Sequence, residues 1–158
     1  VNCYLPGVPR VMYMPFPFQI VQSPGIMLMA SEYVGATRSI HMGEVDAPPI
    51  DTFMGHSVGH WEGDTLVIES DTFNEQTWFD RAGNFHSEAL RVIERITPIS
   101  RDALRYEATI EDSKVFTRPW TISLPLYRRL EPNAEILEFN CVEFVEETLW
   151  GHLKKEDE

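Results

Sequence analysis

The sequence is divided into short runs in which apolar and polar residues alternate, and turn-forming triplets separate one run from the next. The clearest triplet is Glu62-Gly63-Asp64, between "GHSVGHW" and "TLVIES". A period of two puts every second side chain on one face of a strand, and glycine supplies the positive φ that a tight hairpin turn needs. Similar triplets are Ser23-Pro24-Gly25, Ser100-Arg101-Asp102 and Glu131-Pro132-Asn133. The pattern therefore predicts a series of antiparallel hairpins.

The expected strands cover 17–23, 25–34, 36–42, 55–61, 65–70, 90–99, 103–112, 118–130 and 135–144. Residues 87–96 also satisfy helical spacing, but their β-branched residues and the hairpin partner that follows favour a strand from about Leu90. A sheet of about nine strands joined by short connections leaves two edge strands with unpaired backbone groups. Closing the sheet into a barrel pairs these edges with each other. We predict an all-β fold, an antiparallel meander that closes into a lipocalin-like barrel of about eight to ten strands. A short helix or tail is expected at 145–155.

The chain of 158 residues is expected to form one domain, a single β-barrel domain over 1–158. Its formal net charge of −12 disfavours nucleic acid and anionic membranes as partners, because both bind through lysine and arginine. No apolar run approaches the ~20 residues of a transmembrane helix, and no signal peptide is visible. The expected partner is a small-molecule ligand or substrate, and a homo-oligomer is compatible with the sequence.

The two cysteines, Cys3 and Cys141, lie near opposite ends of the sequence. If the first and last segments pair, a disulfide would close nearly the whole chain, which suits an oxidising compartment. The alternative is two buried free thiols, and the sequence leaves both readings open. The chain starts at Val1, which fits a mature, signal-cleaved protein as well as a fragment.

Two connections, 43–53 and 71–85, are too long to be simple turns. The second combines aromatic residues, acids and an amide, and long loops in a tightly connected barrel are usually functional. A histidine against an apolar wall, oriented by a carboxylate, can act as a general base near neutral pH. We predict His86 as the base, with Asp80 or Glu88 orienting it, and His56 as the group that polarises the substrate oxygen. The alternative is that His86 and Ser87 only hydrogen-bond the loop to the barrel rim.

Large or polar side chains in and near this loop are expected to contact the substrate. The predicted substrate-binding residues are Trp78, Asn74, Trp61 and Arg118. Arg118 precedes a Pro-Trp pair, so it could stack on an indole or bind a carboxylate in a pocket. The pair Glu94-Arg95 allows a buried ion pair or a bridge across neighbouring strands.

The spacing of His56 and His60 resembles half of a zinc site when it is read as a helix. On a strand the two residues are roughly 13 Å apart, too far to share one ion. We therefore expect no metal and no organic cofactor, although the fold could bring His56 near His86. Six methionines (Met12, Met14, Met27, Met29, Met42 and Met54) are expected to line the core or an adaptable apolar pocket.

Three long motifs are "GHSVGHWEGDTLVIE", "FNEQTWFDRAGNFHSEALRVIER" and "YEATIEDSKVFTRPWT", which come between "YLPGVP" with "PFQIVQSPG" and a late Cys-Val-Glu. In this order they resemble a functionally uncharacterised family of mostly exported bacterial proteins, over essentially the whole chain. The resemblance implies a β-rich fold and export, hence a periplasmic or secreted location, with a cytoplasmic one left open. His60 stands where that family's pattern has an arginine, which argues against a family-wide role for it.

These features support three hypotheses. The first is a cofactor-independent lyase, isomerase or hydratase that uses histidine and aspartate for acid–base chemistry on a small, partly apolar molecule in the barrel mouth. The second is a non-catalytic, lipocalin-like protein that binds a small apolar ligand. The third is a surface or assembly module in which these residues only support the fold. The positions of His86 and His56 relative to a common cavity discriminate between the first two.

Overall fold

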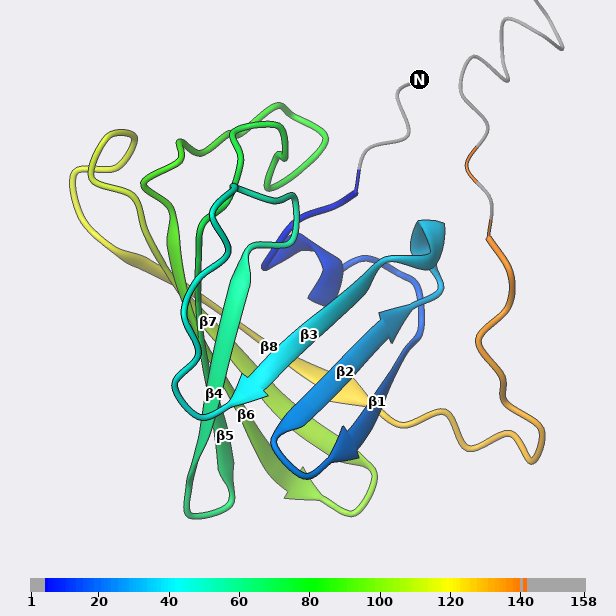
Figure 1. The fold of residues 1–158 in the computed structure, drawn as a ribbon. Coiled ribbons are helices and arrows are strands. Elements are labelled where there is room, and N and C mark those ends of the chain that lie inside the picture. Colours follow the sequence, from blue (N-terminus) through cyan, green and yellow to red (C-terminus); the bar gives the residue numbers. More distant parts are fainter. Residues whose placement is uncertain (1–4, 140, 142–158) are drawn as a thin grey trace, which may run out of the picture.

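The computed structural model describes residues 5–139 and 141, and it confirms an all-β, lipocalin-like fold (Figure 1). Eight strands form one sheet in sequence order. They are β1 (Phe18–Ser23), β2 (Ile26–Ser31), β3 (Thr37–Met42), β4 (His56–Glu62), β5 (Thr65–Asp71), β6 (Arg91–Ser100), β7 (Ala103–Glu111) and β8 (Trp120–Tyr127). Two short 3-10 helices, η1 (Arg10–Met12) and η2 (Tyr33–Gly35), accompany them. Within these residues no helix has the length and apolar character to cross a membrane.

Three of the four predicted hairpins form at their turn triplets, and residues 91–100 are a strand rather than a helix. The hairpin expected at Glu131-Pro132-Asn133 does not form among the described residues. One pairing differs from the predicted antiparallel meander. Strands β3 and β4 are parallel, and only Ile40–Met42 pair with Ser57–Gly59. The reason is the connector 43–55, which runs back along the sheet to the end where β3 begins (Figure 1). Gly59 allows the close approach, because a Cβ there would lie 2.8 Å from Cγ2 of Ile40.

The sheet curls into a half-barrel around one apolar core, and in the described chain β1 and β8 are not paired with each other (Figure 1). The expectation of a ninth strand over 135–144 is wrong for the residues that can be described, since 135–139 and 141 are not in a strand. This segment packs on η2 instead: Phe139 stacks on Tyr33, and the amide of Leu137 donates to Glu32. The expected helix over 145–155 and Cys3 lie outside the described residues.

A buried polar network crosses the inner face of the sheet from β3 to β7. Arg38 donates through Nε to Ser57 Oγ at 2.9 Å and through Nη2 to Ser70 Oγ at 2.7 Å, and Nη2 also pairs with Glu94. Tyr106 donates to the other oxygen of Glu94 at 2.7 Å. Burial and the neighbouring carboxylate raise the pKa of Tyr106 well above its usual value, so its hydroxyl remains a donor.

The buried ion pair of Glu94 is therefore formed with Arg38, and neither Arg95 nor Arg118 pairs with Glu94. Arg95 pairs with Glu62 at the surface, and Arg118 is exposed. The expectation for the methionines is confirmed for Met12, Met27, Met29 and Met54, which are buried in the core, and Met42 packs against it.

Candidate functional site

The loop between β5 and β6 surrounds His86 and uses both nitrogens of its ring. Nε2 lies 2.6 Å from Thr77 Oγ1, and Nδ1 lies 3.0 Å from the carbonyl oxygen of Ser87. The rings of Phe73 and Phe79 lie against the imidazole, and only 2% of His86 is exposed. A substrate could reach neither nitrogen without breaking one of these hydrogen bonds, so the geometry favours a structural role, in which His86 joins two parts of the loop to each other.

A second clamp fixes the exit of the same loop through Ser87, which the alternative reading had named, and through Asp112, which it had not. Ser87 donates to Asp112 twice, through its amide at 2.6 Å and through its hydroxyl at 2.9 Å. Asp112 also accepts from the amides of Lys114 and Val115. Burial opposes the charge of Asp112, but these hydrogen bonds outweigh it and hold the pKa of its carboxyl below the usual value. Asp112 is 25 residues from Ser87 in the sequence, so no local pattern marks the pair.

The carboxylates predicted to orient His86 have other partners. Asp80 accepts from the amide of Ala82 at 2.8 Å and from the amide and side chain of Asn84, and the Asn84 side chain is the main cause of its lowered pKa. This is a turn in which an aspartate caps its own loop. Glu88 forms an exposed ion pair with Lys114. Neither carboxylate bonds His86 in the structure.

The predicted substrate-binding residues are dispersed over the surface rather than gathered around a cavity. Trp78 and Trp61 are about half exposed, and Arg118 is exposed. Asn74 accepts the amide of Gln76 at 3.1 Å, as part of a local turn. None of the four lines either of the two large cavities described below.

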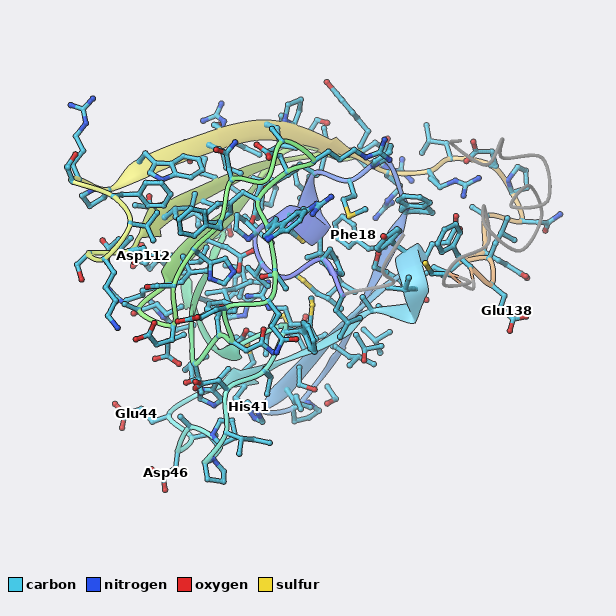
Figure 2. All side chains as sticks on the ribbon, turned by 90° about the horizontal axis from the view of Figure 1, so that it is seen from above. Phe18, His41, Glu44, Asp46, Asp112 and Glu138 are labelled. Atoms are coloured by element: carbon cyan, nitrogen blue, oxygen red, sulfur yellow. The ribbon has the colours of Figure 1, made fainter. Side chains whose placement is uncertain are left out.

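His56, the fourth predicted catalytic residue, lies in a different place, where β3 and β4 separate. Their short pairing ends at Ile40 and Ser57, and the connector 43–55 covers the opening between them. The opening is a cleft of about 490 Å³, which we call the His56 cleft. It is lined by Leu5, Thr37, Arg38, Ser39, His41, Asp46, Pro48, Thr52, Phe53, Met54, Gly55, His56 and Ser57. In Figure 2, Glu44 and Asp46 project outward from the connector beside His41.

The imidazole of His56 is held from two sides. Its ring stacks on His41 with centroids 5.6 Å apart and an interplanar angle of 28°. Its Nδ1 faces Oδ1 of Asp71, the residue opposite it in the β4–β5 hairpin, at 3.9 Å. Gly55 sets the entry into β4: its φ is +70°, and a Cβ there would lie 2.4 Å from the Phe73 ring. Local backbone geometry therefore fixes where His56 lies.

Two buried nitrogens of the cleft-lining residues have no hydrogen-bond partner within the described chain: Nε2 of His56 and Nη1 of Arg38. The His56 side chain is 11% exposed, and that of Arg38 is 2% exposed. Nη1 can only donate, whereas Nε2 donates or accepts according to its tautomer. The cleft thus combines unused polar groups with apolar walls from Leu5, Phe53 and Met54. Among the residues that can be described, no group of three or more histidines, cysteines or acids could hold a metal ion.

Sequence reasoning identified His56 but not its surroundings. The pairing with Asp71 could have been found, because counting outward from the Glu62-Gly63-Asp64 turn puts these two residues opposite each other. The contribution of His41 depends on the parallel pairing of β3 with β4, which has no local signal. No protein-family model, curated protein or solved structure matches this chain.

Proposed function

We propose that this protein binds a small, partly apolar molecule in the His56 cleft, through a polar group that hydrogen-bonds His56. The observation that carries the proposal is the imidazole of His56, which is largely buried, stacked on His41, faced by Asp71 at Nδ1, and left with an Nε2 that has no partner in the described chain. A buried polar group without a partner costs about 1–3 kcal/mol, and a ligand that bonds it recovers that cost.

The size and lining of the cleft support a ligand rather than a macromolecule. About 490 Å³ lies within the usual ~300–1,000 Å³ of small-molecule sites. Such sites are mostly apolar with a few polar groups that fix orientation, as His56 and Arg38 would do here. Because Arg38 offers only N–H donors, the ligand should carry a carbonyl or carboxylate oxygen.

The second candidate function is acid–base catalysis at the same cleft, with His56 rather than His86 as the base. The observation in its favour is Asp71 behind Nδ1, at 3.9 Å, while Nε2 has no partner in the described chain. A carboxylate that accepts from Nδ1–H selects the tautomer that leaves Nε2 free to take a proton, and Asp71 would do so by closing the 3.9 Å gap to Nδ1. The reaction class would be proton abstraction next to a carbonyl, which needs no cofactor and fits a lyase or isomerase.

The resemblance of the three long motifs to those of exported bacterial proteins supports a proposal about the compartment in which the protein works. If the resemblance holds, the ligand is a molecule met in the periplasm or outside the cell. Fractionation of the native host, with detection of the chain in each compartment, tests this separately from binding.

A library of small carbonyl and carboxylate compounds, tested by calorimetric titration, examines the binding proposal. Compounds that bind the wild type should bind His56→Gln at least about tenfold more weakly, since one buried hydrogen bond is lost. His60→Gln is the matched control, because His60 lies on the same strand with a side chain that is 52% exposed. Equal losses in both variants, or none in His56→Gln, would refute the role of His56.

The catalytic candidate is tested on the compounds that bind. In D₂O, a base at His56 should exchange the proton next to the carbonyl of a bound compound, and proton NMR would follow the loss of that signal. Exchange should stop in His56→Gln and slow in Asp71→Asn, with binding retained in Asp71→Asn. If compounds bind but none of them exchanges its proton for deuterium, the catalytic candidate is eliminated and the binding function alone remains.

A further inference from the structure

The two edge strands of the half-barrel leave a second, larger cavity between them. In the described part of the chain β1 pairs only with β2 and β8 only with β7, and the end of β8 lies beside β1 (Figure 1). The cavity has a volume of about 950 Å³, and we call it the β1–β8 seam. Residues of η1, β1, the β6–β7 turn, β8 and the segment 134–136 line it.

The floor of the seam is apolar. Met12 and Phe18 line it from one side, and Leu104 and Leu126, which are opposite each other in the β7–β8 hairpin, line it from the other. The inward residues of β7, such as Tyr106 and Ala108, are fully buried, whereas those of β8 are only half-buried along its whole length. The core therefore has apolar surface at the seam that the described residues leave uncovered.

The basic lining residues of the seam come from two adjacent segments. Arg101 and Asp102 form the β6–β7 turn, and Arg128 and Arg129 follow β8 directly. The amide of Arg128 donates to the carbonyl of Asp102 at 2.9 Å, which holds the two segments together. Three arginines thus line this end of the seam.

Not all of this positive charge is neutralised locally. Arg128 faces Asp102 at 3.7 Å and Arg129 faces Glu131 at 3.5 Å, but Arg101 forms no ion pair with a described residue. The lining contains two carboxylates, Asp102 and Glu135, against the three arginines. Glu131, the partner of Arg129, brings the carboxylates around the seam to three, so the region as a whole is not positively charged. Arg101 is the arginine of the lining that no described carboxylate pairs, and its charge can attract an anionic group.

We propose that the β1–β8 seam binds an amphipathic anion with one extended aliphatic tail, that is, a long-chain carboxylate. The tail lies between Phe18 and Leu126, and the carboxylate is bound by Arg101 with its neighbours in the turn. The volume suits one such molecule. This site is separate from the His56 cleft, because the two sets of lining residues share no member.

Calorimetric titration with dodecanoate, below its micelle concentration and at low salt, tests the proposal. The wild type should bind one dodecanoate per chain with saturation. Arg101→Glu should weaken that binding about tenfold or more, since a charge-assisted contact becomes a repulsion, and should leave dodecanol binding unchanged. Arg105→Glu is the matched control, because Arg105 is exposed on β7 and does not line the seam. This variant should bind dodecanoate and dodecanol as the wild type does.

Leu126→Gln is a second variant that should weaken dodecanoate and dodecanol alike, with circular dichroism confirming that it is folded. Failure of the wild type to bind dodecanoate, or equal losses in Arg101→Glu and Arg105→Glu, would overturn the proposal. So would sedimentation velocity showing a dimer that Leu126→Gln dissociates, because the seam would then be an interface between copies.

Discussion

His86 and His56 come from similar sequence contexts, each next to a long loop with aromatic and acidic residues. In the folded protein they differ in how many of their ring nitrogens are hydrogen-bonded. His86 has both ring nitrogens hydrogen-bonded and is 2% exposed. His56 is held by a stacked ring and a facing carboxylate and belongs to the lining of a cleft, and its buried Nε2 has no partner among the described residues. Hydrogen-bond capacity that the fold leaves unused, rather than the presence of a histidine near acids, distinguishes a candidate site from a structural clamp.

The largest expected effect concerns the polar network beside the cleft. Arg38→Met should destabilise the protein by about 3–5 kcal/mol, because it leaves the carboxylate of Glu94 buried without its cation. Arg95→Met removes an exposed pair with Glu62 and should cost less than about 1 kcal/mol. The free energy of unfolding in urea measures both. Similar values for the two variants would show that the Arg38 network does not hold the sheet together.

The next effect separates the two histidines by stability. His86→Ala should lower the free energy of unfolding by about 2–4 kcal/mol, since a fully buried ring and its hydrogen bond to Thr77 are lost. His56→Ala should cost about 1 kcal/mol, because its Nε2 forms no hydrogen bond that the substitution could remove. Urea unfolding of both variants under one set of conditions makes the comparison. A larger cost for His56→Ala would reverse the structural assignment.

A third effect is a pH dependence of the clamped loop. The pKa of Asp112 is lower in the folded protein than its ordinary value of 3.8, so its charged form stabilises the fold. That contribution is present above the ordinary value and is lost as the pH falls through the lowered folded pKa. Asp112→Asn should therefore cost about 1–3 kcal/mol at pH 6 and progressively less below pH ~4. A cost that does not change with pH would contradict the charged clamp.

The smallest expected effect on stability is at Asp71, whose side chain is 61% exposed. Asp71→Asn should change the free energy of unfolding by less than about 0.5 kcal/mol. If His56 is a base, the same variant should still slow deuterium exchange of a bound compound. A large loss of stability without an effect on exchange would make Asp71 a structural residue like Asp112.

The turns and strands of the meander could be predicted because their signals are local. Period-two runs and turn triplets correctly placed the β1–β2, β4–β5 and β6–β7 hairpins. The parallel pairing of β3 with β4 was missed because it depends on the path of the connector 43–55, and alternation of residues does not encode direction. The ninth strand was predicted from its alternating pattern, but Leu137 and Phe139 instead contact the η2 region. That contact is a tertiary interaction, and the β-propensity of a segment does not predict it.

The candidate site was predictable only in part, for a related reason. His56 and His86 can be identified from the sequence as candidate catalytic residues. The number of hydrogen bonds that each side chain makes in the folded protein cannot. Thr77, which occupies one nitrogen of His86, is nine residues away, and Asp112, which clamps the neighbouring Ser87, comes from the end of another hairpin. Hydrogen-bond saturation is a property of the assembled fold, and it is the observation that favours a structural role for His86.

The most direct test of the assignment is NMR of the histidine ring nitrogens, in protein labelled with ¹⁵N at histidine and titrated with small carbonyl and carboxylate compounds. Compounds that bind should shift the ring-nitrogen signals of His56, with a smaller change at His41, and leave those of His86 unchanged. Compounds that shift His86 while His56 stays unchanged would contradict the assignment, and would return the site to the loop between β5 and β6.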